Sequence, residues 1–517
     1  MRACWFSLCL ALSACSVVLS DLNYRSIMPI DADGHMVDVK TDELEQLQAP
    51  VTHESRARAH ARAMVEAMLA PNAGKALIYL HGGLNRVSAT SAAADDLLVP
   101  MRKAGYHPIL INWDSAFGPA YRKHLVRSKS GRPSTAWDGL TAPATVLWDV
   151  AATTMLAPKA LYSALSDSLH SNVFFHKKHW YELLGETPVC TREGAAQSRS
   201  CRVDHSRPWT HDWPTGWDRF QKASWWWATS PLRLAFTPVV DRLGRDAWTQ
   251  MLRNTRNLFN PEATFDAHKD EGTDSGALAI FLDELAKRLD HDKRPLQITI
   301  VAHSMGAILA DEILRRYMHH PLLVFDQIVY LAAASSTRDS MHAIHNYLEA
   351  QPEAHFYAVT LHPFAEDRER RAGMLAPDGS LLVWVDSMFE PSRHFLDRRF
   401  GRWENLKPVL PYLLREEGFG HTADTDIRDE KIRALKVVRA RPELQQAAQL
   451  SELTPPASPI RDRMHFTVEG FFNSPQWHNQ LNKPEHQFWC PGFWVGNEVP
   501  PESVCAPQPS RDLSRSR

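Results

Sequence analysis

The sequence predicts an α/β fold in which a mostly parallel sheet is covered by helices and interrupted by a large inserted Trp-rich cap. First, apolar strand-like segments alternate with helical ones from Lys75 onwards, with short connections, as in parallel α/β proteins. Second, a long stretch, 117–273, breaks this alternation, which is typical of an inserted subdomain. The chain of 517 residues is long enough for both parts.

Five strand-like segments each contain a run of apolar residues. They are KALIYLHGGLN, HPILINWDS, LQITIV, DQIVYLAAAS and HFYAVTLHP. LQITIV is a continuous β-branched run, of the kind found in strands buried on both faces, as in parallel sheets. The intervening ALAIFLDELAKRLD and GAILADEILRRYM carry apolar residues at three- and four-residue spacing, which predicts helices.

These patterns divide the chain into six predicted segments. They are an export leader (1–20), an N-terminal segment (21–70), the first part of the α/β core (71–116), the inserted cap (117–273), the second part of the core (274–470) and a C-terminal extension (471–517). The cap holds three adjacent tryptophans, Trp225 to Trp227, whose side chains cannot all face one side of an element. This run favours contact of one of them with a substrate, a lipid surface or another subdomain.

The first 20 residues predict export of the protein. Arg2 gives a positive start, and Asp21 ends the apolar run before it could span a bilayer. Two processing sites fit. The stretch Leu12–Cys15 resembles the bacterial lipobox and predicts a lipoprotein of the cell envelope, anchored in the outer membrane through Cys15. Cleavage after Val18–Ser20 instead predicts a soluble periplasmic or secreted protein.

Export changes how the remaining cysteines are interpreted. In an oxidising compartment, two local disulfides are predicted, Cys190–Cys201 and Cys490–Cys505. A zinc site that adds His205 to the first pair is an alternative, but its spacing fits no usual zinc motif. The net charge of -2 predicts no nucleic-acid partner, and the absence of HExxH, GxGxxG and P-loop motifs predicts no metal and no cofactor.

Chemistry is predicted at Ser304, within IVAHSMGAIL. A serine hydroxyl attacks a carbonyl only when a base takes its proton and donors stabilise the oxyanion. A strained turn between a buried strand and a helix presents such a serine, and it requires small residues two positions before and after it. These positions hold Ala302 and Gly306. Glycine is usual at the first, and alanine adds only one methyl group.

A second motif, His81-Gly82-Gly83, follows the strand that begins at Lys75. Together with the Ser304 turn, it resembles the α/β-hydrolase superfamily of serine esterases and lipases, over about residues 75–116 and 275–470. The resemblance implies an oxyanion hole made of backbone N–H groups, namely that of Met305 and one from Gly82, Gly83 or Leu84.

The resemblance also implies a chain order of nucleophile, acid and histidine. The acid is expected after HFYAVTLHP, at Glu366 or Asp367, with Asp339 after the preceding strand as the alternative. His465 is the preferred base because it lies in a late segment before the aromatic-rich FTVEGFFNSPQW. The other candidates are His421, His394 and His478.

The sequence therefore predicts an exported serine hydrolase that cleaves carboxylic esters of small molecules or lipids through an acyl-enzyme on Ser304. Two alternatives stay open. An acyltransferase would use the same triad with an alcohol in place of water. A non-catalytic envelope lipoprotein would instead bind a ligand through the Trp-rich cap.

Overall fold

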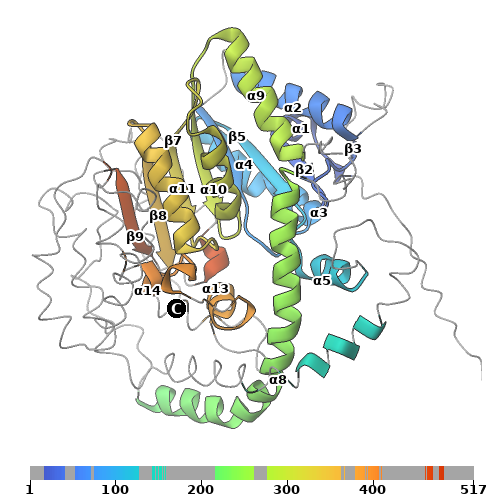
Figure 1. The fold of residues 1–517 in the computed structure, drawn as a ribbon, viewed down its shortest axis with the longest axis vertical. Coiled ribbons are helices and arrows are strands. Elements are labelled where there is room, and N and C mark those ends of the chain that lie inside the picture. Colours follow the sequence, from blue (N-terminus) through green and yellow to red (C-terminus); the bar gives the residue numbers. More distant parts are fainter. Residues whose placement is uncertain are drawn as a thin grey trace, which may run out of the picture.

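The fold is built on a seven-stranded sheet whose neighbouring strands are all parallel (Figure 1). The computed structural model describes residues 17–40, 53–70, 75–126, 216–260, 276–361, 379–390, 394–406, 463–469 and 477–481, with single residues and short stretches between them. Across the sheet the strands are β2 (Ile27–Ile30), β5 (Tyr106–Trp113), β4 (Lys75–Leu80), β6 (Leu296–His303), β7 (Leu323–Leu331), β8 (His355–Leu361) and β9 (Met464–Glu469). The predicted α/β class with a parallel sheet is confirmed.

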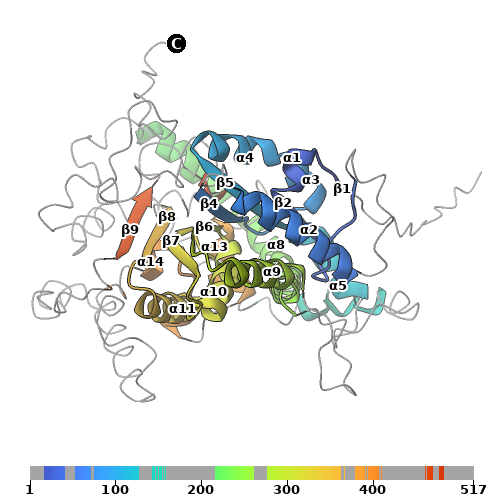
Figure 2. The same ribbon diagram turned by 90° about the horizontal axis from the view of Figure 1, so that it is seen from above.

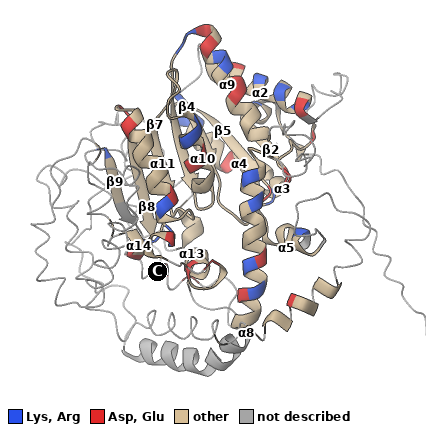
Figure 3. Cartoon of the chain, viewed as in Figure 1, with Lys and Arg blue, Asp and Glu red and all other residues tan. Residues whose placement is uncertain are grey.

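Helices cover both faces of the sheet (Figure 2). One face carries α9 (Ala277–Asp292), α10 (Gly306–Tyr317) and α11 (Thr337–Ala350), with α2 (His53–Leu69) packed against α9; the other carries α3 (Val87–Ala92) and α4 (Ala94–Lys103). Ile78, Ile300 and Val329 on the central strands are fully buried, as expected for strands covered on both sides. Charged residues lie mainly on the helices and not on the strands (Figure 3).

A 42-residue helix, α8 (Gly216–Asn257), precedes α9 and extends beyond the edge at which the strands end (Figure 1). The three adjacent tryptophans fall within it, but their side chains lie outside the described residues. Helix α5 (Phe117–Val126) packs against α8. No described helix has a stretch both long enough and apolar enough to cross a bilayer.

The N-terminal residues that the structure describes belong to the folded core. Strand β1 (Val17–Val18) pairs with β3 (Val39–Lys40). The side chains of Val17 and Leu19 are both 5% exposed, and Ser20 caps the short helix α1 (Asp21–Tyr24). Cleavage after Ser20 would remove all of these contacts, whereas cleavage before Cys15 would keep them. Cys15 and the four cysteines of the predicted disulfides lie outside the described residues.

A chain that begins at Asp21 should therefore be less stable than one that begins at Ser16. Burying an aliphatic side chain contributes about 1.5–3 kcal/mol, so the loss of Val17 and Leu19 should lower the free energy of unfolding by about 3–6 kcal/mol. Urea unfolding of the two purified chains measures this difference. Equal midpoints would show that β1 contributes nothing to the fold.

Candidate active site

Ser304 occupies the turn between β6 and α10, at the carboxyl edge of the sheet. Its φ angle is +53°, a left-handed conformation that is costly for a residue with a side chain. Backbone hydrogen bonds hold this conformation. The N–H of Ser304 donates to the Leu331 carbonyl (2.8 Å), and its own carbonyl accepts from the N–H of Ala334 (2.9 Å). The structure thus shows the strand-to-helix turn predicted for this serine, with a strained backbone at Ser304 itself.

Small residues on either side of Ser304 are required by the neighbouring strand β4. A Cβ atom added to Gly306 would lie 2.3 Å from the carbonyl oxygen of Leu80. Ala302 is fully buried in β6, paired with Leu80, so its methyl group fits where glycine would be usual. Helix α10, which follows the serine, therefore begins in direct contact with the end of β4 and has no room for a side chain at its first residue.

The His81-Gly82-Gly83 turn at the end of β4 lies against Ser304. A Cβ atom on Gly82 would be 3.0 Å from the Cβ of Ser304, and one on Gly83 would be 2.6 Å from the Sδ of Met305. Side chains at either position would fill this space, so the backbone of the turn comes as close to the serine as glycine allows.

The buried His81 fixes the shape of this turn. Its Nε2 accepts from the N–H of Trp113 (3.0 Å), so its Nδ1 carries the proton and donates to the Gly82 carbonyl (2.6 Å). The Asn85 amide also donates to that carbonyl (2.9 Å). Burial lowers the pKa of His81 to about 4, which keeps the ring neutral and this tautomer in place near neutral pH.

The hydrogen bonds of the turn distinguish between the possible oxyanion donors. The N–H of Leu84 donates to the Ser115 carbonyl (2.9 Å) and is therefore occupied. Within the part of the chain that the structure describes, no acceptor binds the N–H of Gly83 or of Met305. These two groups, and that of Gly82, remain as donors for a negatively charged oxygen next to Ser304.

Two buried carboxylates follow β8 at the same edge of the sheet. Glu366 is 2% exposed and accepts a hydrogen bond from the Ser380 hydroxyl (2.8 Å). Burial raises the pKa of Glu366 to about 8, against the opposing charge of Arg402. Glu369 is also buried, and its Oε2 accepts from the backbone N–H of His478 (2.9 Å). Asp367 lies outside the described residues.

His478 lies in a short 3-10 helix, η9 (His478–Gln480), after β9. Its side chain is buried, and its ring centroid is 5.0 Å from that of His303, the residue before Ser304. His303 donates from Nε2 to the carbonyl of His478 (3.2 Å). Among the predicted histidines that the structure describes, His478 is thus the one that lies next to both a buried carboxylate, Glu369, and the residue before Ser304.

The preference for His465 as the base does not agree with the structure. His465 is the second residue of β9, pairs with Tyr357 of β8 and stacks on its ring at 4.7 Å. The amino half of a parallel strand lies at the edge opposite to that of Ser304. Likewise, Asp339 is exposed and caps α11 together with Ser336, and His394 is exposed. His421 lies outside the described residues.

Glu369 was missed by sequence reasoning. It belongs to the charged run EDRER, from Glu366 to Arg370, which is usually a solvated surface. The signal that could have found it is position, since this run directly follows a strand that ends at the site edge. In the structure Glu366 and Glu369 are buried, which a charged run in a loop does not predict.

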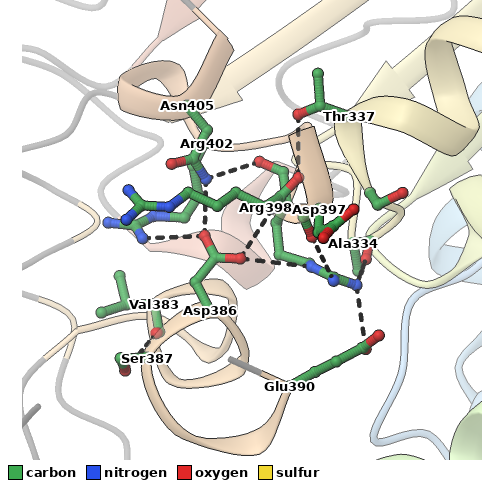
Figure 4. Close-up of polar contacts among 12 residues, drawn as sticks. Ala334, Thr337, Val383, Asp386, Ser387, Glu390, Asp397, Arg398, Arg402 and Asn405 are labelled. Atoms are coloured by element: carbon green, nitrogen blue, oxygen red, sulfur yellow. Dashed lines mark hydrogen bonds and ion pairs between the residues drawn. The ribbon is translucent and has the colours of Figure 1, made fainter. Parts of the chain in front are cut away.

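A buried polar network supports the chain after β7 (Figure 4). Arg399 is 4% exposed and donates to the Ala334 carbonyl (3.1 Å). The N–H of Ala334 in turn donates to the carbonyl of Ser304. Asp386, in the π-helix η6 (Val385–Phe389), accepts from the Arg399 N–H (2.9 Å) and from the Asn405 amide (2.7 Å). Asn405 belongs to α14 (Trp403–Leu406). The network therefore fixes the irregular segment after β7, which positions the turn at Ser304.

Helix α8 covers the His81-Gly82-Gly83 turn. The Cε of Met251 would lie 2.8 Å from a Cβ on Gly83. The Trp248 indole donates to Glu390 (2.8 Å), and Arg245 donates to the Met388 carbonyl (2.8 Å), which ties α8 to η6 and its end. Gly244 allows this close packing, because a Cβ there would overlap the ring of Phe389.

One group among the described residues has the composition of a metal site. The ligand atoms of His124, Asp149 and Asp246 lie within 4.8 Å of one another. The guanidinium of Arg242 lies 2.7 Å from Asp149 and 3.2 Å from Asp246, so it supplies the positive charge that a cation would bring. The ion pairs of this group therefore connect α5 with α8.

A cavity of about 760 Å³ lies behind the nucleophile turn, between α8, α10 and α11. Its wall is formed largely by charged side chains, including Arg399 and Glu390 of the network above, and by Asp311 of α10. The buried carboxyl of Asp311 accepts from Tyr330 (2.7 Å) and Ser340 (3.0 Å). Ser304 and His478 are not part of its wall.

Replacing Gly306 with alanine should disrupt the nucleophile turn. The added Cβ would meet a backbone oxygen that cannot move away, so the free energy of unfolding should fall by about 1–3 kcal/mol. Gly118→Ala in α5 is the matched control. Its Cβ would have no atom nearer than 4.0 Å, so stability should stay unchanged or rise by less than about 1 kcal/mol. Denaturant unfolding of both variants measures the difference, and equal effects would contradict the crowding at Gly306.

Replacing Glu366 with glutamine should reduce the pH dependence of stability. Because the pKa of Glu366 rises from 4.5 to about 8 on folding, the folded protein keeps a proton that the unfolded chain releases. The stability from this proton is fully present below pH 4.5 and is lost as pH rises through 8. Glutamine stays neutral and still accepts from Ser380. Between pH 4.5 and 8, the free energy of unfolding of the variant should rise relative to that of the wild type by about 1.4 kcal/mol per pH unit. Denaturant unfolding of both proteins at pH 5 and pH 8.5 measures this change. A pH-independent difference would contradict the raised pKa.

Comparison with known proteins gives no relative for this chain. No protein-family model, no curated protein and no solved structure matches it. A function is therefore inferred from the geometry around Ser304, the glycine turn and the His478–Glu369 contact.

Proposed function

We propose that this protein is a serine hydrolase of the α/β-hydrolase type, which cleaves carboxylic esters through an acyl-enzyme on Ser304. One observation carries the proposal. Ser304 is held in a strained left-handed conformation at a strand-to-helix turn, directly against the paired glycines of the turn that follows the neighbouring strand. Strain of this kind persists only where surrounding contacts maintain it, and it is concentrated at functional sites.

The proposed mechanism is acyl transfer in two steps. His478 takes the proton of Ser304 as its Oγ attacks the ester carbonyl, and the oxyanion accepts hydrogen bonds from the N–H groups of Met305 and Gly83. The alcohol leaves with the proton from His478. Water then attacks the acyl-enzyme, again with His478 as base, and releases the acid.

Glu369 is the proposed carboxylate partner of the base. It accepts a hydrogen bond from the backbone N–H of His478, which supports the proposal that this carboxylate lies next to the base. In the proposed mechanism it orients the imidazole and stabilises its charged form. Glu366 is less suited to this role. Its raised pKa, about 8, leaves it protonated near neutral pH, so it carries no negative charge to stabilise an imidazolium.

The proposed substrate is an ester of a small molecule or lipid. Residues 117–273 are proposed to form a cap over the site, which is supported by the contact of Met251 in α8 with the glycine turn. Export and lipid attachment at Cys15 belong to the same proposal. Cleavage before Cys15 is supported by the pairing of Val17–Val18 with β3, which a cut after Ser20 would destroy.

Covalent labelling by a fluorophosphonate probe tests this function, because the probe reacts only with an activated serine. Wild-type protein should be labelled, and Ser304→Ala should not. His478→Ala should lower the labelling rate by about 100-fold or more, since a positioned base contributes about 10²–10⁴-fold. Glu369→Gln should lower it by at least about tenfold. His465→Ala is the matched control and should label like the wild type.

Two outcomes would overturn these assignments. A folded wild-type protein that the probe does not label would contradict the hydrolase proposal. Retained labelling in His478→Ala together with its loss in His465→Ala would move the base to the other edge of the sheet.

A further inference from the structure

We propose that His303, the residue before the nucleophile, is a positioning residue that holds the base His478 in place through its backbone carbonyl. This inference rests on the proposed function, in which His478 serves Ser304. It assigns to His303 a role that the strand-to-helix turn itself does not require, because that turn needs small residues only at positions 302 and 306.

The contacts of His303 connect three parts of the site. Its side chain is 3% exposed and lies between the glycine turn and η9. A Cβ on Gly82 would lie 2.6 Å from Nδ1 of His303, while Nε2 donates to the carbonyl of His478 at 3.2 Å. The two imidazole rings lie 5.0 Å apart, tilted by 46°. His303 therefore fills the space between the oxyanion turn and the base.

Both backbone polar groups of His478 are held by side chains from other elements. Its N–H is bound by Glu369, which follows β8, and its carbonyl by His303, the last residue of β6. The second bond ties the base to β6, the strand that directly precedes Ser304. A displacement of about 1 Å in a catalytic group can cost about 10²-fold in rate, so a modest hydrogen bond here can have a large effect on reaction.

The carbonyl oxygen of His478 can only accept a hydrogen bond, so Nε2 of His303 carries the proton. This requirement distinguishes two conservative replacements. The amide nitrogen of glutamine reaches about as far from the backbone as Nε2 of histidine and can donate to the same carbonyl. The amide nitrogen of asparagine is one methylene group shorter and cannot reach it.

The test compares His303→Gln with His303→Asn in the full-length protein. The measurements are the rate constant of fluorophosphonate labelling, kcat and KM for a short p-nitrophenyl ester, and the urea unfolding midpoint. The glutamine variant should stay within about threefold of the wild type. The asparagine variant should lose about 10- to 100-fold in labelling rate and kcat with little change in KM. The two unfolding midpoints should be alike.

The background of His478→Ala provides the control for a merely structural role. If His303 acts through the base, His303→Asn should have no further effect on labelling once His478 is absent, so the two effects are strongly non-additive. Additive effects, or equal rates in the asparagine and glutamine variants, would overturn the inference and leave the proposed function standing. Absence of labelling at Ser304 in the folded wild type would instead overturn the proposed function itself.

Discussion

The close contact between Gly306 and the carbonyl of Leu80 is the constraint on which the site depends. Because helix α10 starts directly against the end of β4, the chain has no room for a gradual turn after β6. Ser304 adopts a positive φ angle in this tight turn, and its Cβ lies next to Gly82, in the turn that follows β4. The parallel pairing of β4 and β6 brings the two turns together, so the sheet itself positions the proposed nucleophile next to its proposed oxyanion donors.

Irregular backbone at this edge is stabilised by buried charge. Removing arginine and aspartate from water costs several kcal/mol per ion unless hydrogen bonds satisfy them. Arg399 and Asp386 meet this condition because each binds backbone as well as an opposite charge (Figure 4). The hydrogen bond of Arg399 to the Ala334 carbonyl adds to the backbone hydrogen bonds that Ala333 and Ser335 accept from Gly401 and Phe400, and together they hold the segment after β7. The buried charges thus stabilise the non-helical segment after β7, whose Ala334 binds the carbonyl of Ser304.

The sequence predicted the parts of the site that local patterns encode. Apolar runs identify β4, β5, β6, β7 and β8, and small residues around Ser304 identify its turn, because both depend on neighbours in the chain. The partners depend on register and loop paths, which single-sequence patterns do not contain. His465 and His478 are only thirteen positions apart, yet strand pairing places the first in the wrong half of β9. The burial of Glu369 could not be foreseen either, because charged runs in loops are usually exposed.

The buried position of Val17 also limits how a membrane tether could act. If a lipid were attached at Cys15, only Ser16 would separate the acylated residue from Val17, the first residue that the structure describes. An extended residue spans about 3.3–3.6 Å, so the acylated Cys15 would lie no more than about 7 Å from Val17. Such a protein could not rotate freely above the bilayer. The corner of the fold formed by β1 and β3 would rest on the lipid headgroups, and this contact would decide which way the carboxyl edge of the sheet faces.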